Sequence, residues 1–193
     1  MSIMKIAQYN VQRPKLGVMT PFIHSTSQYD VIAIQEPWLN PHMQATYCPL
    51  DCPYTVIFPP IGRARTCFLI NKAITVSSWS HNQSILTPDY CQITFQLPTG
   101  QLTIHNIYSQ MPPSTNATEW ESPIPAMLKN IQNGDSGHLV VGDFNLHHQM
   151  WGGDTMERAY EGATYLVEAI EMGTLQLLSS RGASTIEKHG NRP

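Results

Sequence analysis

Four short apolar stretches of the chain end in polar side chains that suit the chemistry of a phosphate ester. These side chains are, in chain order, Asn10, Gln35 with Glu36, Tyr108, and Asp143 with Asn145. One carboxylate and an amide oxygen make a partly open site for a Mg²⁺ ion that keeps several waters. Such an ion polarises a phosphoryl oxygen and stabilises a leaving alkoxide. Asp143 is suited to orient a nucleophilic water, and Asn145 and Tyr108 to donate hydrogen bonds to phosphate oxygens.

The segment His138–Gly152, HLVVGDFNLHHQMWG, carries two of these residues. Its apolar run Leu139–Val141 is short, β-branched and closed by glycine, which predicts a buried strand rather than a helix. The residues Asp143, Phe144 and Asn145 then predict strand-like alternation, with the polar side chains on one face and the ring buried on the other. The alternative is an ordinary strand followed by an Asx turn, because Asp and Asn favour turns.

The segment Tyr29–Pro37, YDVIAIQEP, places a carboxylate at the end of a second buried strand. The run Val31–Ile34 has no polar alternation, which is typical of a strand covered on both faces. Glu36 follows this run, and a carboxylate at a buried position needs a metal cation or an arginine nearby. A salt bridge that caps the strand is the alternative. The polar residues at the other strand ends favour a metal ion as the partner of Glu36.

The rest of the chain predicts one mixed α/β domain, 1–193, in which strands outnumber helices. The segment Pro98-Thr99-Gly100 predicts a hairpin turn between two alternating strands. The further expected strands are Lys5–Val11, Tyr54–Phe58, Thr66–Ile70, Ile74–Ser78, Cys91–Leu97, Leu102–Tyr108 and Leu175–Leu178. The expected helices are Leu16–Ser27, with Pro21 in its first turn, Trp120–Gln132 and Ala159–Gly173.

The composition indicates a globular intracellular protein. The 193 residues are 41% hydrophobic and 13% charged, which is enough for one well-cored domain and argues against disorder. A net charge of −3 gives no support to broad electrostatic attraction to nucleic acid. The four scattered cysteines lack zinc-site spacing and predict free buried thiols in a reducing compartment. The N-terminus is unlike a signal peptide, and no stretch approaches transmembrane length, so no membrane partner is expected.

The order of these residues resembles the endonuclease/exonuclease/phosphatase family of metal-dependent phosphodiesterases. The matching residues are Asn10 in QYNV, Glu36 in QEP, Tyr108 in NIYSQ, and Asp143 with Asn145 in GDFN. DVIAIQEPWL and GDFNLHHQMWG are similar to one branch of that family, the apurinic-type endonuclease domain of non-LTR (LINE-like) retrotransposons. The resemblance extends from about residue 5 to residue 188 and rests on four motifs in the family's order.

The resemblance implies a four-layered α/β sandwich, with two packed mixed β-sheets flanked by helices. It implies that Glu36 binds Mg²⁺ or Mn²⁺ with Asn10 beside it, and that Asp143, Asn145 and Tyr108 serve the scissile phosphate. DNA is the implied substrate, the nucleus the implied location, and fusion to a reverse transcriptase in a longer polypeptide the implied context.

The sequence departs from the family pattern after residue 188. The family continues with an aspartate-bearing strand and a Ser-Asp-His motif whose histidine is the acid/base partner, and this sequence has neither. We therefore expect a domain incomplete at its C-terminus, lacking its final strands, and residues 1–193 alone to be inactive or nearly so as a nuclease. A catalytically inactive retrotransposon remnant stays open as an alternative, as does a small-molecule or lipid phosphodiesterase or phosphatase of the same fold.

Five further residues are candidates for contacts to nucleic acid. Arg63 and Arg65 flank a glycine turn, which suits either a solvated loop or phosphate contacts. His147 and His148 suit either packing of the loop or contact with DNA. In the same loop, Trp151 is expected to anchor the chain rather than to stack on a base. Thr185 lies in ASTI, which resembles the threonine strand of the family.

Overall fold

The computed structural model describes residues 3–42, 46, 49, 51–110, 122–134, 136–153 and 160–182. The chain divides into two compact units. Unit 1 comprises Met1–Gln110 with Glu121–Phe144, and unit 2 comprises Met111–Trp120 with Asn145–Pro193. Both β-sheets belong to unit 1, so the ends of the predicted strands can be compared within one body.

The first sheet has the strand order β1-β2-β4-β3. Its strands are β1 (Ile6–Asn10), β2 (Val31–Gln35), β3 (Tyr54–Ile57) and β4 (Thr66–Asn71). β1 and β2 are parallel, with Asn10 opposite Gln35, whereas β2–β4 and β3–β4 are antiparallel. Every residue of β2 is buried, as its unbroken apolar run predicts.

The second sheet has the strand order β5-β6-β7-β8. Its strands are β5 (Trp79–His81), β6 (Tyr90–Leu97), β7 (Gly100–Tyr108) and β8 (Gly137–Asp143). The predicted hairpin joins β6 to β7, with Leu97 opposite Gly100. β7 and β8 are parallel, with Tyr108 opposite Asp143. Each sheet therefore contains one parallel pair whose strands end in predicted site residues.

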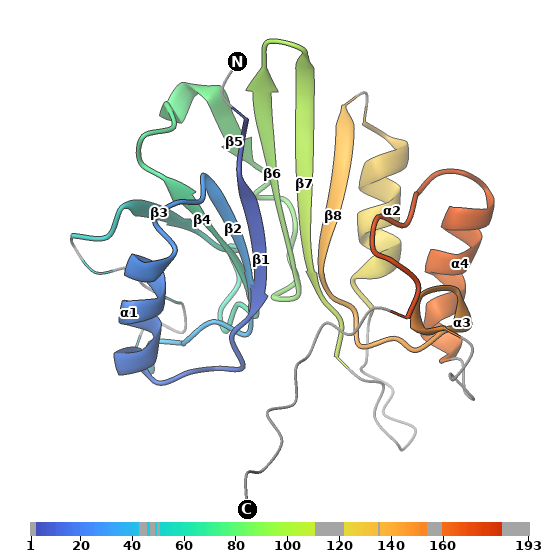
Figure 1. The fold of residues 1–193 in the computed structure, drawn as a ribbon, viewed down its shortest axis with the longest axis horizontal. Helices are drawn as coiled ribbons and strands as arrows, with labels where there is room; N and C mark the ends of the chain where they lie inside the picture. Colours follow the sequence, from blue (N-terminus) through green and yellow to red (C-terminus); the bar gives the residue numbers. More distant parts are fainter. Residues whose placement is uncertain are drawn as a thin grey trace, which may run out of the picture. The chain divides into compact units, whose positions relative to one another are not determined.

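Two helices of unit 1 complete a sandwich of four layers (Figure 1). α1 (Leu16–Ser25) packs on the outer face of the first sheet, where Met19 and Ile23 join Ile32 and Ile34 in one apolar cluster. α2 (Ile124–Gln132) covers the outer face of the second sheet. Pro21 lies in the interior of α1 rather than in the first turn that was predicted, because the helix begins at Leu16.

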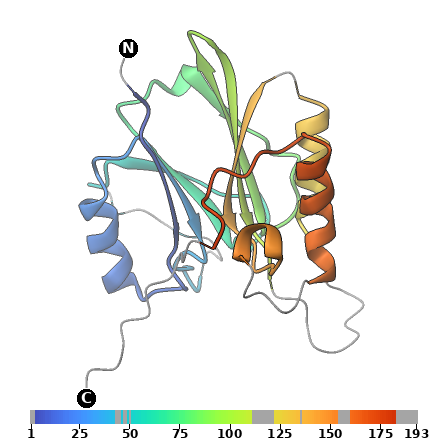
Figure 2. The same cartoon turned by 45° about the vertical axis from the view of Figure 1, so that its right-hand side comes forward.

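The main core fills the space between the two sheets (Figure 2). Alternate residues of β2 point inward, so Val31 and Ala33 meet Ile93 and Ile104 of the second sheet, while the residues between them face α1. Burial of these side chains fixes which face of each strand is inside. The register of the strand ends follows from it. This arrangement confirms the predicted α/β sandwich of two packed mixed sheets.

Unit 2 contains three further described helices. They are α3 (Gln149–Gly152), the short 3₁₀ helix η2 (Glu161–Ala163) and α4 (Thr164–Glu171). α4 ends before Gly173, which has a φ of 74° and stops the helix as the sequence predicts. None of the helices among the described residues is long and apolar enough to cross a membrane.

Two predicted strands are wrong. Residues 76–78 of the expected strand Ile74–Ser78 form a 3₁₀ helix, η1, and the strand β5 starts only at Trp79. The apolar residues of this segment predicted a strand wrongly, because Val76 is 72% exposed and does not point into the core. The expected strand Leu175–Leu178 has no regular structure, and Leu178 is 77% exposed. A short apolar run without a strand to pair with does not form a β-strand.

The cysteines differ in part from the expectation of free thiols. Cys67 and Cys91 are free and buried, and burial raises the pKa of both thiols, that of Cys91 to about 12. These two side chains therefore behave as apolar core residues. Cys52 is disulfide-bonded, so the prediction is wrong there. Cysteine spacing alone does not reveal such a pairing.

Candidate active site at the strand ends

The ends of β1 and β8 are joined by a hydrogen bond across the two sheets. Asn10 Nδ2 donates to Asp143 Oδ2 at 2.6 Å. Asn10 Oδ1 in turn accepts from the backbone N–H of Gln12 at 2.9 Å, which fixes the orientation of the amide. Because β1 and β8 belong to different sheets, this bond is a tertiary contact that aligns the two parallel pairs at the same edge of the sandwich.

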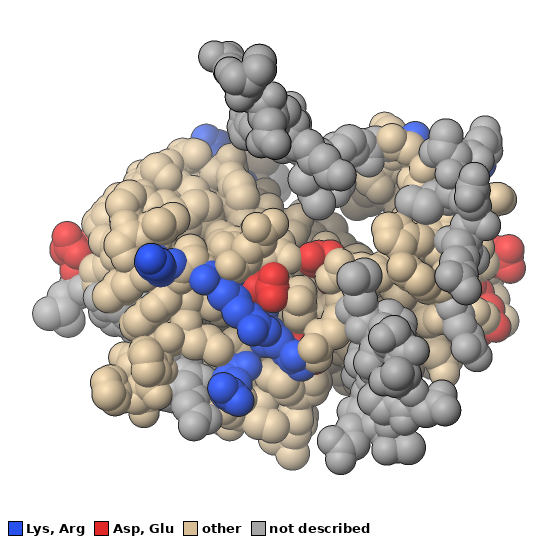
Figure 3. All heavy atoms as spheres, turned by 90° about the horizontal axis from the view of Figure 1, so that it is seen from below, with Lys and Arg blue, Asp and Glu red and all other residues tan. Residues whose placement is uncertain are grey.

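The ends of β2 and β7 are joined in the same way. Tyr108 Oη donates to Glu36 Oε1 at 2.9 Å. The same carboxylate oxygen lies 3.4 Å from Nε of Arg13, and the Glu36 side chain is only 17% exposed. The cationic partner expected near Glu36 is Arg13 in this structure. Figure 3 shows basic side chains beside acidic ones on this side of the molecule.

The backbone around Glu36 holds its side chain at the strand end. Its φ is 50°, in the left-handed region that non-glycine residues seldom adopt. The Glu36 N–H donates to the Arg65 carbonyl at 2.8 Å, and the Glu36 carbonyl accepts from the Arg13 N–H at 2.7 Å. Left-handed residues cluster at functional sites, where surrounding contacts hold them. The conformation turns the chain out of β2 directly after Gln35.

A buried amide pair lies beneath these residues, and the sequence analysis missed it. Asn106 on β7 accepts from Gln35 Nε2 at 2.5 Å and donates to the carbonyls of Ile34 at 3.1 Å and Cys67 at 2.8 Å. Both side chains are fully buried. Gln8 on β1 also donates to Gln35. The sequence does contain a signal for this pair: Asn106 is a polar residue on the inward face of β7, which is otherwise apolar. A buried amide needs hydrogen-bond partners.

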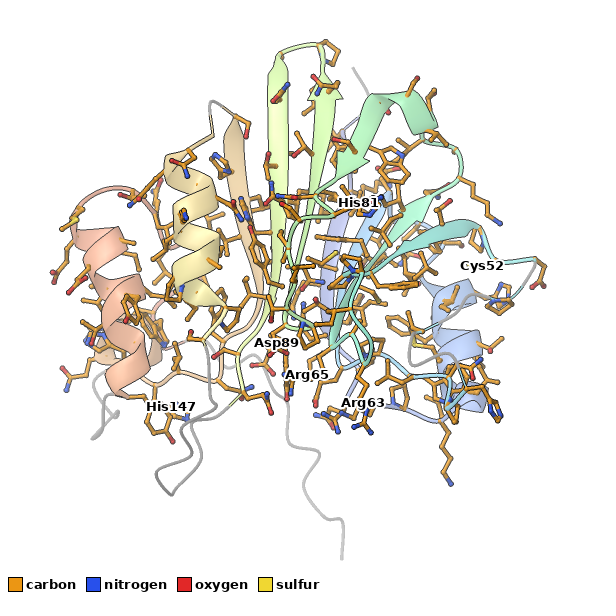
Figure 4. All side chains as sticks on the ribbon, turned by 180° about the vertical axis from the view of Figure 1, so that it is seen from behind. Cys52, Arg63, Arg65, His81, Asp89 and His147 are labelled. Atoms are coloured by element: carbon orange, nitrogen blue, oxygen red, sulfur yellow. The ribbon has the colours of Figure 1, made fainter. Side chains whose placement is uncertain are left out.

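The half-buried Arg65 pairs with the buried Asp89 (Figure 4). Arg65 Nη2 lies 2.5 Å from Asp89 Oδ2, and its guanidinium carbon lies 5.9 Å from the centre of the Tyr108 ring. Burial raises the pKa of Asp89 in spite of this pairing. The carbonyl of Asp89 also accepts from the Tyr108 N–H at 2.9 Å. The pair therefore positions Tyr108, and only 21% of the Arg65 side chain is exposed for the predicted DNA contact.

Tyr108 is held as a hydrogen-bond donor. Burial raises its pKa to about 12, and the hydrogen bond to Glu36 and the charges of Glu36 and Asp143 act in the same direction. A phenol with this pKa stays protonated at neutral pH. Its proton is therefore available to a carboxylate or to another anionic oxygen.

Gly142 brings Asp143 close to β7. Its φ is 153°, and a Cβ atom at this position would lie 2.1 Å from the carbonyl oxygen of Ile107. Only glycine allows this approach of two backbones. Directly after the strand, the Ser109 N–H donates to the Asp143 carbonyl at 2.8 Å. The glycine of the GDFN motif is therefore required by the packing of β8 against β7.

Asn145 does not continue the strand as its alternation with Asp143 predicted. β8 ends at Asp143, and Asn145 has a left-handed φ of 47°. The left-handed conformation of Asn145 takes it out of the strand, and Asn tolerates this region better than most residues. Asn145 belongs to unit 2.

The described side chains of Trp151, His147 and His148 make contacts within unit 2. Trp151 Nε1 donates to the Leu146 carbonyl at 2.8 Å, which confirms the expected anchoring role. His147 packs on Tyr160 with ring centres 4.9 Å apart, and His148 Nδ1 accepts from the Met150 N–H at 3.2 Å. Thr185 lies outside the described residues. In unit 1, Arg63 is exposed, with a φ of 60°.

The oxygen atoms at the strand ends suit a hard divalent cation. Glu36 and Asp143 supply carboxylate oxygens and Asn10 an amide oxygen, and such donors favour Mg²⁺ or Mn²⁺ over softer metals. No cluster of three or more His, Cys, Asp or Glu side chains that could enclose a metal occurs among the residues described by the structure. A cation held here would therefore keep several of its waters.

The fold of the chain is similar to that of known endonucleases. Residues 102–192 match the family model described as endonuclease-reverse transcriptase. The endonuclease domain of TRAS1, a telomere-specific non-LTR retrotransposon, is similar in structure with a TM-score of 0.65 and 16% identity. The match covers 96% of this chain and 78% of that domain. No curated protein sequence matches the chain.

A second solved structure of the same fold is the AP endonuclease LMAP from Leishmania major. Its TM-score is 0.53 at 15% identity, and the match covers 81% of this chain and 57% of LMAP. The chain thus spans less than two thirds of that protein. Together with the family model, these likenesses confirm the resemblance inferred from the sequence. The chain has the endonuclease/exonuclease/phosphatase fold, with a retrotransposon endonuclease domain among its structural neighbours.

Proposed function

We propose that this protein is a divalent-metal-dependent phosphodiester hydrolase that nicks DNA, of the kind encoded by non-LTR retrotransposons. The observation that carries the proposal is the pair of hydrogen bonds Asn10–Asp143 and Tyr108–Glu36. These bonds gather residues from four strands of two sheets, at the positions where the sequence matched the family motifs. DNA as the substrate is supported by the retrotransposon endonuclease and the AP endonuclease among the structural neighbours.

In this proposal Glu36 holds a Mg²⁺ or Mn²⁺ ion, with Asn10 beside it. The cation, when bound, polarises a phosphoryl oxygen and lowers the cost of charge on the leaving oxygen. The donor set fits such an ion, because a carboxylate and an amide oxygen are hard ligands of the kind that Mg²⁺ and Mn²⁺ prefer. Few carboxylates are present, so we expect weak metal binding.

The remaining residues act on the phosphate and on the attacking water. Asp143, oriented by Asn10, accepts a hydrogen bond from the nucleophilic water and aims it at the phosphorus. Tyr108, protonated at neutral pH, donates to a phosphate oxygen, and Asn145 is assigned the same role. The proposal assigns both units to one domain. Contacts to DNA by Arg63, Arg65, His147, His148 and Thr185, nuclear location and fusion to a reverse transcriptase belong to the same proposal.

The test combines Mn²⁺ binding with nicking of supercoiled plasmid DNA. Glu36→Gln should weaken Mn²⁺ binding at least ten-fold and abolish metal-dependent nicking, since it removes the only charge assigned to the cation. Asp143→Asn should abolish nicking and leave the protein folded. Glu171→Gln, at the exposed end of α4, removes the same charge and should change neither.

The two readouts also separate the alternatives. Nicking by the 193-residue chain should be slow, because a positioned acid or base typically contributes about a hundred- to ten-thousand-fold and the sequence lacks the Ser-Asp-His motif. Mn²⁺ binding that depends on Glu36 without any nicking would show that residues 1–193 hold the cation but lack nuclease activity. Mn²⁺ binding unaffected by Glu36→Gln, together with residual nicking by Asp143→Asn, would contradict the assigned site.

A further inference from the structure

Arg13 pairs with Glu36, the carboxylate that the proposed function assigns to a metal ion. Its Nε lies 3.4 Å from Glu36 Oε1, and 61% of its side chain is exposed. Neither the family motifs nor the spacing of the strand ends singled out this residue. The guanidinium partly neutralises the carboxylate that is assigned to the divalent cation. A cation that binds Glu36 must therefore act against a positive charge that is already present.

The backbone keeps Arg13 within reach of Glu36. Gln12 and Arg13 are consecutive non-glycine residues in the left-handed region, with φ of 54° and 49°. Such residues are uncommon, and each costs free energy that neighbouring contacts must offset. The contacts here are Gln12 N–H to Asn10 Oδ1 and Arg13 N–H to the Glu36 carbonyl, at 2.9 and 2.7 Å. The main chain of Arg13 is thus tied to the site itself.

The side-chain contact, in contrast, is easily exchanged. Arginine binds carboxylates most strongly through two parallel N–H···O bonds, whereas this pair has a single Nε contact at 3.4 Å and an exposed guanidinium. Tyr108 donates to the same oxygen at the shorter distance of 2.9 Å. The guanidinium can therefore leave Glu36 while the phenol keeps the carboxylate in place.

We propose that Arg13 is a built-in competitor of the divalent cation for Glu36. Its guanidinium occupies the carboxylate in the metal-free protein and sets how much metal is needed to load the site. The inference rests on the proposed function, because it requires Glu36 to be the metal-binding residue. A purely structural role for Arg13, in which the ion pair only stabilises the turn after β1, makes a different prediction for metal affinity.

The test measures Mn²⁺ affinity by calorimetry or electron paramagnetic resonance in the full chain. Arg13→Gln should bind Mn²⁺ about five-fold more tightly than wild type, which is the size expected from removing one exposed, screened ion pair. Arg13→Lys keeps the charge and should stay within two-fold of wild type. Lys15→Gln is the matched control: it loses the same charge two residues away, and Lys15 forms no ion pair within the described part of the chain.

The outcomes distinguish this inference from the proposed function. Tighter Mn²⁺ binding by Arg13→Gln, and by neither Arg13→Lys nor Lys15→Gln, supports the role of Arg13 as a competitor of the cation. Equal affinity in Arg13→Gln and Lys15→Gln, with Glu36→Gln still weakening binding, overturns the competitor and leaves the proposed function intact. Equal tightening in Arg13→Lys and Arg13→Gln also overturns it, because charge would not be the cause. Binding that Glu36→Gln does not weaken overturns both. Melting curves of each variant verify that the fold is retained.

Discussion

Replacement of Asn106 by alanine tests whether the buried amide pair holds the two sheets in register beneath the site. The wild-type amide makes three hydrogen bonds, to Gln35 and to the carbonyls of Ile34 and Cys67. Alanine leaves these three groups without Asn106 as a partner in a region that is fully buried. A buried polar group that loses its partner costs about 1–3 kcal/mol, with carbonyls at the lower end because they have a second lone pair.

The expected loss of unfolding free energy is about 4 kcal/mol. About 1 kcal/mol comes from each carbonyl, and about 2 kcal/mol from the Gln35 amide together with the volume that the shorter side chain vacates. For a chain of 193 residues this corresponds to a fall in melting temperature of about 10 °C. Gln101→Ala, which removes an exposed amide from the same strand, should cost less than about 0.5 kcal/mol.

Urea unfolding followed by circular dichroism measures these differences. A loss below about 1 kcal/mol for Asn106→Ala would refute the reasoning, because it would mean that water or a neighbour replaces all three bonds. Asn106→Asp provides a second check. It keeps an acceptor for Gln35 but replaces the amide nitrogen, which donates both of the other bonds, by an oxygen that faces two carbonyls. Burial raises the pKa of the new carboxyl, so its folded state favours the proton, and the destabilisation should shrink as the pH is lowered from 7 to 5.

Three other changes test separate parts of the structure. Gly142→Ala should lower the free energy of unfolding in urea by more than about 3 kcal/mol, because its Cβ would lie 2.1 Å from the Ile107 carbonyl oxygen. Gly17→Ala in α1 has open space around it and should instead raise the free energy of unfolding by up to about 1 kcal/mol. Burial lowers the pKa of His105 from 6.5 to about 3, so wild-type stability should fall as the pH falls through this window. Thermal melts of His105→Leu should show a smaller fall, and a fall as large as that of wild type would contradict the assignment. The pKa of Tyr108 is raised to about 12, so stability should be lost as the pH rises from 10 to 12, and Tyr108→Phe should lack this part of the loss.

The sequence by itself determined the fold class and the residues that end four of its strands. The unbroken apolar run of β2 and the alternation of β6 are local patterns, because burial on one or both faces dictates the residue type at each position. The glycine stop after α4 and the two-residue hairpin between β6 and β7 are likewise set by local backbone geometry. The family motifs could be recognised for the same reason, since each lies within a few residues of a strand end.

The patterns of apolar residues predicted strands wrongly where a run had no neighbouring strand to pair with and where the chain left a strand. Val76 and Leu178 belong to apolar runs, yet both are exposed, because a strand needs a neighbour to supply its hydrogen bonds. Asn145 was assigned to the continuation of β8, but the chain leaves the strand after Asp143. Periodicity does not indicate where a strand stops when the residues that follow are compatible with both conformations.

Only the tertiary structure decided which side chains meet. Asn10 and Asp143 are 133 positions apart, and Glu36 and Tyr108 are 72 apart, so their hydrogen bonds depend on how the two sheets stack. The partner of Glu36, Arg13, comes from a turn in an uncommon backbone conformation that no propensity predicts. Asn106 lies in an ordinary strand sequence and makes its three hydrogen bonds only because the opposite sheet presents two carbonyls and an amide to it. Contacts of this kind depend on how the two sheets pack against each other. The sequence indicates which side chains lie on each face of a strand, but it does not indicate which of them meet across the two sheets.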